Sequence, residues 1–229
     1  MKSIPVQAPL YPEPPYYYEG ANGVFFVYET EKENIKKVLP EFIDVGDMPL
    51  VALAVLEYPK TTIGPYNEAY ALVQAKCEDV SGWFNPFMWV DTDDALAAGR
   101  EIWGFPKKIA DIKVLKEEEQ VKGVVERRGI KIIDTVVEPT SPLEMPFEAS
   151  VLTFKQMFKA DGSGEEVKRV ILTKLDNKII ENMSGKGVIK FGKSKDDPIS
   201  ILKPKQLAAS VYVKMNLTLP YGKIIKTIV

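Results

Sequence analysis

Short apolar or alternating runs, separated by Gly, Pro, Asn and Asp, dominate the sequence. Their length and their Val, Ile, Tyr, Phe and Thr content predict strands at 24–29, 49–58, 68–77, 83–90, 109–115, 121–127, 130–137, 150–157, 167–175, 187–191 and 209–217. Many short strands with few helices are typical of an all-β or β-rich α+β fold. We therefore expect an antiparallel sheet that is closed or nearly closed.

Two short helices interrupt this strand pattern. Thr30, followed three residues later by Glu33, resembles a capping box for a helix through residue 39. Asp91 and Thr92 can cap a second helix over 93–99, whose first residues are acidic as the helix dipole favours. Turns are expected at Arg128-Gly129 and at 161–164, which lacks the Gly-Lys-Ser/Thr ending of a phosphate loop.

The strand predicted at 68–77 has two different faces. Side chains two residues apart share a face, so Glu68 lies with Tyr70 and Leu72, whereas Ala69 and Val73 face the other way. The second face is entirely small or apolar. Glu68 therefore opens a mixed face that can line a site.

Residues 1–20 form a Pro- and Tyr-rich arm that is not expected to make regular structure, and 21–229 are expected to form a single domain. The arm contains too much aromatic surface to be left freely in water. We expect it to pack along its own domain or along a neighbouring subunit, and we predict a homo-oligomer.

Charge and composition limit the chemistry. Thirty basic and thirty-two acidic residues give a net charge of -2, which provides no field for nucleic acid or for an anionic membrane. No apolar run approaches the roughly 20 residues of a membrane span, and we expect a cytoplasmic protein. One cysteine and no histidine exclude a Ser-His-Asp triad and zinc sites with several thiolates. We expect no metal and no organic cofactor, and catalysis by Lys, Glu, Asp, Tyr or Arg.

The stretch from Gly99 to Lys108, with the sequence Gly-Arg-Glu-Ile-Trp-Gly-Phe-Pro-Lys-Lys, is the one segment that suggests a reaction. A lysine amine is a nucleophile only when it is neutral, which requires desolvation or a nearby positive charge. Trp103 and Phe105 can supply a dry wall, and Lys108 can supply the charge. A Pro-Lys-Lys alone is more often solvated surface.

This stretch resembles the active-site segment of the acetoacetate decarboxylase family. The resemblance runs from about residue 22 to the C-terminus and implies a cone-shaped β-barrel with flanking helices. It also implies that Lys107 forms a Schiff base with a β-keto acid. Pro65-Tyr66-Asn67-Glu68 resembles the family segment with an active-site glutamate, which makes Glu68 the candidate for proton transfer. Arg100 and Glu101 are weaker candidates that brace the lysine loop.

The sequence departs from the best-known acetoacetate decarboxylases at two places. Ala54 stands where an acid is expected, and residues 21–23 lack an expected arginine. Two alternatives to decarboxylation of a β-keto acid therefore stay open. One is Schiff-base aldol or dehydration chemistry on a keto acid, and the other is a non-catalytic barrel that binds a small apolar ligand.

Adjacent side chains on a strand point to opposite faces, so one pocket is not expected to hold both lysines. We therefore expect Lys107 to be buried behind Trp103 and Phe105, and Lys108 to point away from it. Charges 4 Å apart in water interact by only about 1 kcal/mol, so desolvation is the stronger means of activation.

Overall fold

The protein is described by a computed structural model that covers residues 3–144 and 149–228. Its strands are β1 Tyr16–Glu29, β2 Asp44–Val45, β3 Leu50–Tyr58, β4 Lys60–Thr61, β5 Tyr66–Cys77, β6 Val80–Val90, β7 Lys107–Ile109, β8 Asp111–Glu117, β9 Gln120–Arg127, β10 Ile130–Pro142, β11 Ala149–Phe158, β12 Glu165–Phe191, β13 Gln206–Leu219 and β14 Lys223–Thr227. The helical segments are α1 Lys32–Lys36, α2 Asp93–Ala98, the π-helical turn η1 Gly99–Trp103 and the 3-10 turn η2 Ile199–Leu202.

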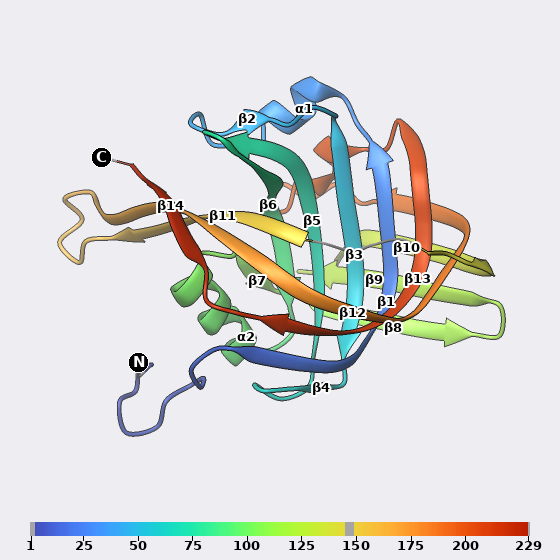
Figure 1. Cartoon of the computed structure of the whole chain (residues 1–229), viewed down its shortest axis with the longest axis horizontal. Helices are drawn as coiled ribbons and strands as arrows, with labels where there is room; N and C mark the ends of the chain where they lie inside the picture. Colours follow the sequence, from blue (N-terminus) through green and yellow to red (C-terminus); the bar gives the residue numbers. More distant parts are fainter. Residues whose placement is uncertain (1–2, 145–148, 229) are drawn as a thin grey trace.

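The sheet closes on itself. Neighbouring strands follow the order β11-β6-β5-β3-β1-β13-β12, and β12 also pairs with β11, which completes a ring (Figure 1). The described pairings are antiparallel except for β11 with β6 and β6 with β7. The predicted β-rich, closed and mainly antiparallel fold is confirmed, although the two parallel pairings were not predicted.

The two faces of the ring wall belong to two different hydrophobic clusters. On β5, Ala69, Ala71 and Val73 pack with residues of β8, β9 and β10, which continue the sheet beyond β12 and cover the outer face of the wall. Tyr66 and Leu72 belong to the other cluster, which also contains Phe25 of β1. The predicted alternation along residues 68–77 is confirmed, and the face that carries Glu68, Tyr70 and Leu72 points into the ring.

The predicted strand boundaries were wrong in several details. Residues 167–175 and 187–191 are parts of one long strand, β12, and β14 was not predicted. Residues 109–115 are divided between β7 and β8. β1 already begins at Tyr16. Tyr16 and Tyr18 are buried while Tyr17 is 57% exposed, which is the alternation of a strand with one buried face. Residues 1–20 are therefore not wholly irregular.

The helix starts also differ from the prediction. The N-cap of α1 is Glu31, and the Thr30 hydroxyl donates instead to the Lys203 carbonyl 2.8 Å away. Thr92 occupies the N-cap of α2 but makes no side-chain cap, because its hydroxyl donates to Asp94. The expected helix over 93–99 ends at Ala98 and continues as η1. In this π-helical turn the backbone hydrogen bonds join residues five apart instead of four, just before the lysines.

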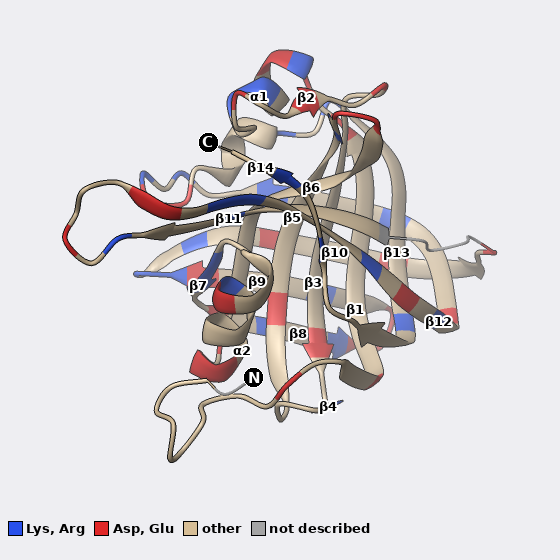
Figure 2. Ribbon diagram, turned by 60° about the vertical axis from the view of Figure 1, so that its left-hand side comes forward, with Lys and Arg blue, Asp and Glu red and all other residues tan. Residues whose placement is uncertain are grey.

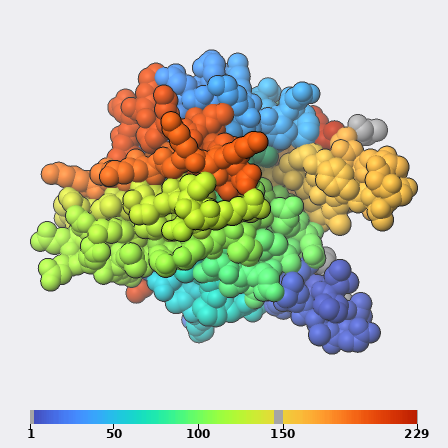
Figure 3. All heavy atoms as spheres, turned by 180° about the vertical axis from the view of Figure 1, so that it is seen from behind, coloured from blue at the N-terminus to red at the C-terminus, as the bar shows by residue number. Residues whose placement is uncertain are grey.

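The N-terminal arm packs on its own domain through its tyrosines. Tyr11 and Tyr16 are buried, and the Tyr16 ring meets the Trp103 ring edge-on at 5.4 Å. Ile4, Val6 and Leu10 stay exposed, and Figure 3 shows the arm extending from the body of the protein. A homo-oligomer and the division into arm and domain stay predictions.

Basic and acidic residues are interspersed along the strands and helices (Figure 2). In the part of the chain that the structure describes, no helix has the length and apolar content needed to cross a membrane.

Candidate active site

The turn that precedes the lysines depends on two glycines. Gly104 has a left-handed φ of 77°, and a Cβ there would lie 2.5 Å from Lys155 Cα, so the neighbouring strand leaves no room for a side chain. The Phe105 N–H closes the turn by donating to the Gly99 carbonyl at 3.0 Å. Lys107 then starts β7 beside Met88 of β6.

Lys107 is buried in contact with a carboxylate. It is 5% exposed, and its Nζ lies 2.9 Å from Glu68 Oε2. The amine also lies 5.4 Å from the centre of the Tyr66 ring and 5.8 Å from that of Phe105. A Cβ on Gly99 would be 2.6 Å from the Lys107 Cδ and Cε, so the lysine stem lies directly on this glycine. The expected burial of Lys107 is confirmed.

Glu68 is held on its other side by a tyrosine. It is 6% exposed, and its Oε1 accepts a hydrogen bond from the Tyr58 hydroxyl at 3.1 Å. Burial raises the pKa of Tyr58 well above its ordinary value, and the nearby Glu68 charge raises it further. Tyr58 therefore keeps its proton at neutral pH and stays a donor to the carboxylate. The Tyr18 and Tyr66 hydroxyls form a second hydrogen bond nearby, at 3.1 Å.

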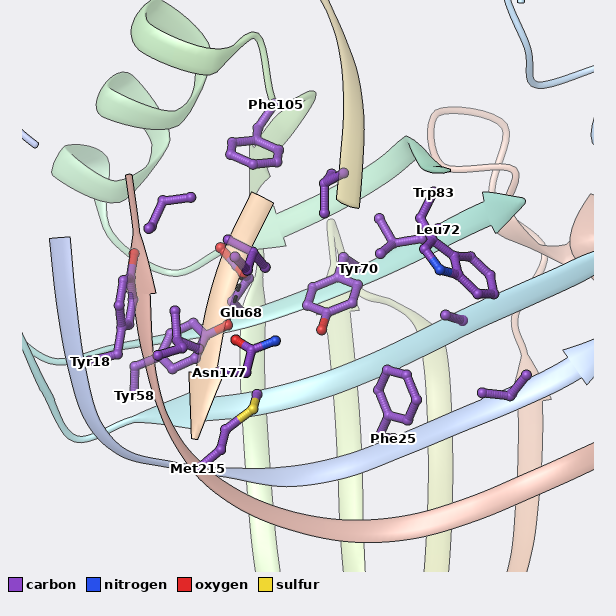
Figure 4. A pocket seen from close by; sticks show the side chains of 16 residues that line it. Tyr18, Phe25, Tyr58, Glu68, Tyr70, Leu72, Trp83, Phe105, Asn177 and Met215 are labelled. Atoms are coloured by element: carbon purple, nitrogen blue, oxygen red, sulfur yellow. Dashed lines mark hydrogen bonds between the residues drawn. The ribbon is translucent and has the colours of Figure 1, made fainter. Parts of the chain in front are cut away.

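Glu68 lies at one end of an apolar cavity of about 200 Å³ inside the ring (Figure 4). The described residues that line it are Tyr18, Phe25, Val27, Ala52, Tyr58, Glu68, Tyr70, Leu72, Trp83, Phe105, Val151, Leu175, Asn177, Met215, Leu217 and Leu219. Within this described lining Glu68 is the one charged residue. Lys107 is not among these lining residues, but its amine contacts Glu68, and the centre of the Phe105 ring lies 5.8 Å from it.

Lys108 points away from Lys107, as predicted. Its Nζ lies 2.9 Å from Asp197 Oδ1, and the same carboxylate accepts from the Trp89 indole at 3.1 Å and contacts Arg127 Nη1 at 3.4 Å. Burial alone would raise the pKa of Asp197, but its hydrogen bonds from Lys108 and Trp89 and the charges of Lys108 and Arg127 outweigh that effect and lower it. Lys108 thus belongs to a separate cluster.

The other predicted residues lie around the lysine loop. Phe105 lines the cavity, whereas Trp103 is placed behind it, with its ring 6.1 Å from Phe105 and its indole donating to the Pro220 carbonyl at 2.8 Å. The expectation that Trp103 directly shields the amine was therefore wrong, and Tyr66 has that place. Arg100 donates to the Lys107 carbonyl at 3.2 Å, and Glu101 accepts a hydrogen bond from Tyr11. Both brace the loop.

Sequence reasoning missed the tyrosines of the site. Tyr58 ends β3 and Tyr66 begins β5, and the two are direct cross-strand partners whose rings lie 4.9 Å apart. Their positions beside the 59–65 turn were the only available signal. Among the described residues, no group of three or more His, Cys, Asp or Glu side chains could hold a metal ion.

A model of the acetoacetate decarboxylase family matches residues 3–228. The chain belongs to the acetoacetate decarboxylase family. This confirms the resemblance inferred from residues 99–108 and 65–68, and it extends the match into the N-terminal arm.

Individual members of the family agree with this assignment. The acetoacetate decarboxylase of Clostridium botulinum is 23% identical, with 97% of this chain and 94% of that protein covered. Acetoacetate decarboxylase 3 of Mesorhizobium japonicum is 32% identical over 54% of this chain, and that match spans 48% of its own length. The match thus spans about half the length of that relative.

Solved structures share the fold over nearly the whole chain. Acetoacetate decarboxylase from Legionella pneumophila superimposes with a TM-score of 0.90 at 27% identity, covering 98% of this chain and 94% of that one. The enduracididine biosynthesis enzyme MppR, complexed with the condensation product of pyruvate and imidazole 4-carboxaldehyde, gives a TM-score of 0.82 at 15% identity, covering 97% and 95%. The second likeness concerns the fold alone.

Proposed function

We propose that this member of the acetoacetate decarboxylase family decarboxylates a β-keto acid through an iminium on Lys107. The observation that supports this most is the contact of a buried lysine amine with the carboxylate of Glu68, 2.9 Å away, at the end of an apolar cavity. Such a pair provides both a nucleophile and a group to accept its proton.

In the proposed reaction, Glu68 takes the proton that the Lys107 ammonium must lose before it attacks. The neutral amine adds to the ketone carbon, and water leaves to give the iminium. The bond between the α-carbon and the carboxylate carbon then breaks, carbon dioxide departs, and the electron pair moves to the iminium nitrogen. The resulting enamine is protonated on carbon and hydrolysed. The iminium is itself the electron acceptor, so the sequence of steps requires no cofactor.

The cavity lining favours loss of the carboxylate over its retention. Among the described lining residues none is Lys or Arg, and most are apolar or aromatic. A substrate carboxylate placed among these side chains loses its water and gains no Lys or Arg partner from the described lining, which destabilises the charged group that decarboxylation removes. An aldol or dehydration reaction would keep that carboxylate in the same apolar surroundings. We therefore prefer decarboxylation to aldol or dehydration chemistry.

Borohydride trapping tests this proposal. The protein is incubated with acetoacetate or with pyruvate, reduced, and analysed by intact mass while carbon dioxide release is followed in parallel. We expect carbon dioxide from acetoacetate and a stable adduct that has lost the carboxyl group. An adduct with pyruvate and no carbon dioxide from β-keto acids would indicate aldol-type chemistry. No adduct with any keto acid would indicate a binding protein and contradict the proposal.

A further inference from the structure

The cavity extends well beyond the reacting end. Glu68, Tyr70 and Leu72 of β5 line it in succession, two residues apart. At 3.3 to 3.4 Å per residue, the four steps from Glu68 to Leu72 cover about 13 Å of strand. Figure 4 shows Glu68, Tyr18 and Tyr58 at one end, Tyr70 in the middle, and Leu72, Trp83 and Phe25 at the other end.

Strand register shows that the far end is a continuous apolar surface. Leu72 pairs with Ala52, and Ala52 pairs with Val27 across three adjacent strands. Trp83 pairs with Val151 where β6 meets β11. These residues, together with Phe25, are the distal pocket: Phe25, Val27, Ala52, Leu72, Trp83 and Val151.

Acetoacetate would leave the distal pocket without a partner. Its chain of four carbons, with C–C bonds of about 1.5 Å, spans only about 5 Å, so a molecule bound to Lys107 ends near Tyr70. Water in the distal pocket would find few of the polar partners that stabilise buried water. An apolar group attached to the substrate would fill this space and bury its own surface.

We infer that the substrate is a β-keto acid that carries an apolar chain of several carbons on the ketone carbon and places that chain in the distal pocket. The inference rests on the proposed function, because covalent attachment at Lys107 fixes which part of the substrate reaches Leu72. The carboxylate then stays at the reacting end, near Phe105 and Tyr58, and the chain extends past Tyr70.

A chain-length series provides the test. The kcat/KM for carbon dioxide release is measured with acetoacetate, 3-oxopentanoate, 3-oxohexanoate and 3-oxooctanoate. Burial of one methylene is worth about 0.8 kcal/mol, so kcat/KM should rise about fourfold for each added carbon until the pocket is full. A kcat/KM that is flat or falls with length in the unmodified protein would overturn the inference.

Ala52→Leu adds volume in the row formed with Val27 and Leu72, and it should reduce the ratio of kcat/KM for 3-oxohexanoate over acetoacetate by about tenfold. Ala208→Leu is the matched control, because Ala208 is exposed on β13 and does not line the cavity, and it should keep the unmodified profile. If Ala52→Leu fails to fold, Leu72→Phe provides the same obstruction. Preference for long chains that survives the obstruction would contradict the inference.

The two proposals fail in different ways. If no keto acid gives carbon dioxide or a borohydride adduct, the proposed function fails and the chain-length inference fails with it. If acetoacetate reacts and is trapped at least as efficiently as its longer homologues, the proposed function stands and only the distal pocket assignment is wrong.

Discussion

Lys107 and Lys108 are adjacent in the chain and each Nζ lies 2.9 Å from a carboxylate oxygen, yet the two lysine–carboxylate pairs lie in different surroundings. The Lys107 side chain is 5% exposed and its partner Glu68 borders the cavity, whereas the Lys108 side chain is 39% exposed. Opposite orientation of successive residues on β7 separates them.

The two carboxylates differ in the number of cations around them. Asp197 is contacted by two cations, Lys108 and Arg127, and accepts a hydrogen bond from Trp89. Glu68 has one lysine and one tyrosine as partners and faces the cavity. A lysine–carboxylate contact by itself therefore does not distinguish the two lysines; the proposed role of Lys107 rests on its partner bordering the cavity.

Removing each lysine in turn should give the largest difference in activity between the two lysine–carboxylate pairs. Lys107→Ala deletes the proposed nucleophile, and carbon dioxide release should fall to the uncatalysed background. Lys108→Ala removes one of two cations from Asp197 and should retain part of the activity. Steady-state rates of both variants, with circular dichroism to confirm folding, provide the measurement. Equal losses in the two variants would show that the distinction between the pairs is wrong.

Glu68→Gln keeps the size of the side chain and the acceptor for Tyr58 but removes the group that we propose takes the lysine proton. We expect turnover to fall by roughly 10²-fold, the range for a lost general acid or base. Borohydride trapping should become slower and remain detectable. Turnover that is unchanged in Glu68→Gln would make the carboxylate a structural partner of Lys107 only.

Asp197→Asn should lower the free energy of unfolding. Asp197 is buried, and removing one partner of a buried charge cluster costs about 3 kcal/mol of the free energy of unfolding. The matched control is Asp111→Asn, whose pair with Lys113 is 59% exposed on both sides and should contribute far less to stability. Urea unfolding of the three proteins measures the difference, and equal midpoints for both variants would contradict it.

The lowered pKa of Asp197 also predicts an acid dependence. A carboxyl whose pKa is lower in the folded than in the unfolded protein stabilises the fold above its unfolded value of about 3.9, and this contribution is lost as the pH falls through the folded value. Unfolding free energies measured from pH 6 to pH 2 should therefore decline less steeply in Asp197→Asn than in the unmodified protein. Parallel slopes would contradict the role assigned to this carboxylate.

Gly99→Ala tests how closely the Lys107 side chain is packed on this glycine. The added Cβ would meet the Lys107 Cδ and Cε at 2.6 Å, which we expect to cost about 1 to 3 kcal/mol of stability and to displace the amine from Glu68. In the double variant with Lys107→Ala the clash disappears, so the stability loss should be much smaller than in Gly99→Ala alone. Additive losses would show that the glycine is needed for another reason.

The sequence predicted local features of the site well. The alternation of residues 68–77 placed Glu68 on the cavity face, and the opposite orientation of successive strand residues separated Lys107 from Lys108. These features need only the two-residue period of a strand. The strand boundaries near 16 and 176–186 were missed because Pro, Gly and charged residues there hide a strand whose pairing is determined by distant partners such as β13.

Contacts between distant segments could not be predicted in the same way. Tyr58 reaches Glu68 because β3 pairs with β5, and Asp197 reaches Lys108 because the segment after β12 returns to the end of β7. Neither of these two contacts follows from local periodicity. Trp103 was expected to form part of a dry wall around the amine, but it does not line the cavity, and its ring packs against those of Tyr16 and Phe105.

The most direct test of the account is to locate the trapped substrate within the chain. The unmodified protein is reduced with borohydride in the presence of acetoacetate, digested with a protease that cleaves at acidic residues, and the fragment containing both lysines is sequenced by tandem mass spectrometry. We predict the reduced adduct on Lys107 and an unmodified Lys108. An adduct on Lys108, or on neither lysine while carbon dioxide is still released, would contradict it.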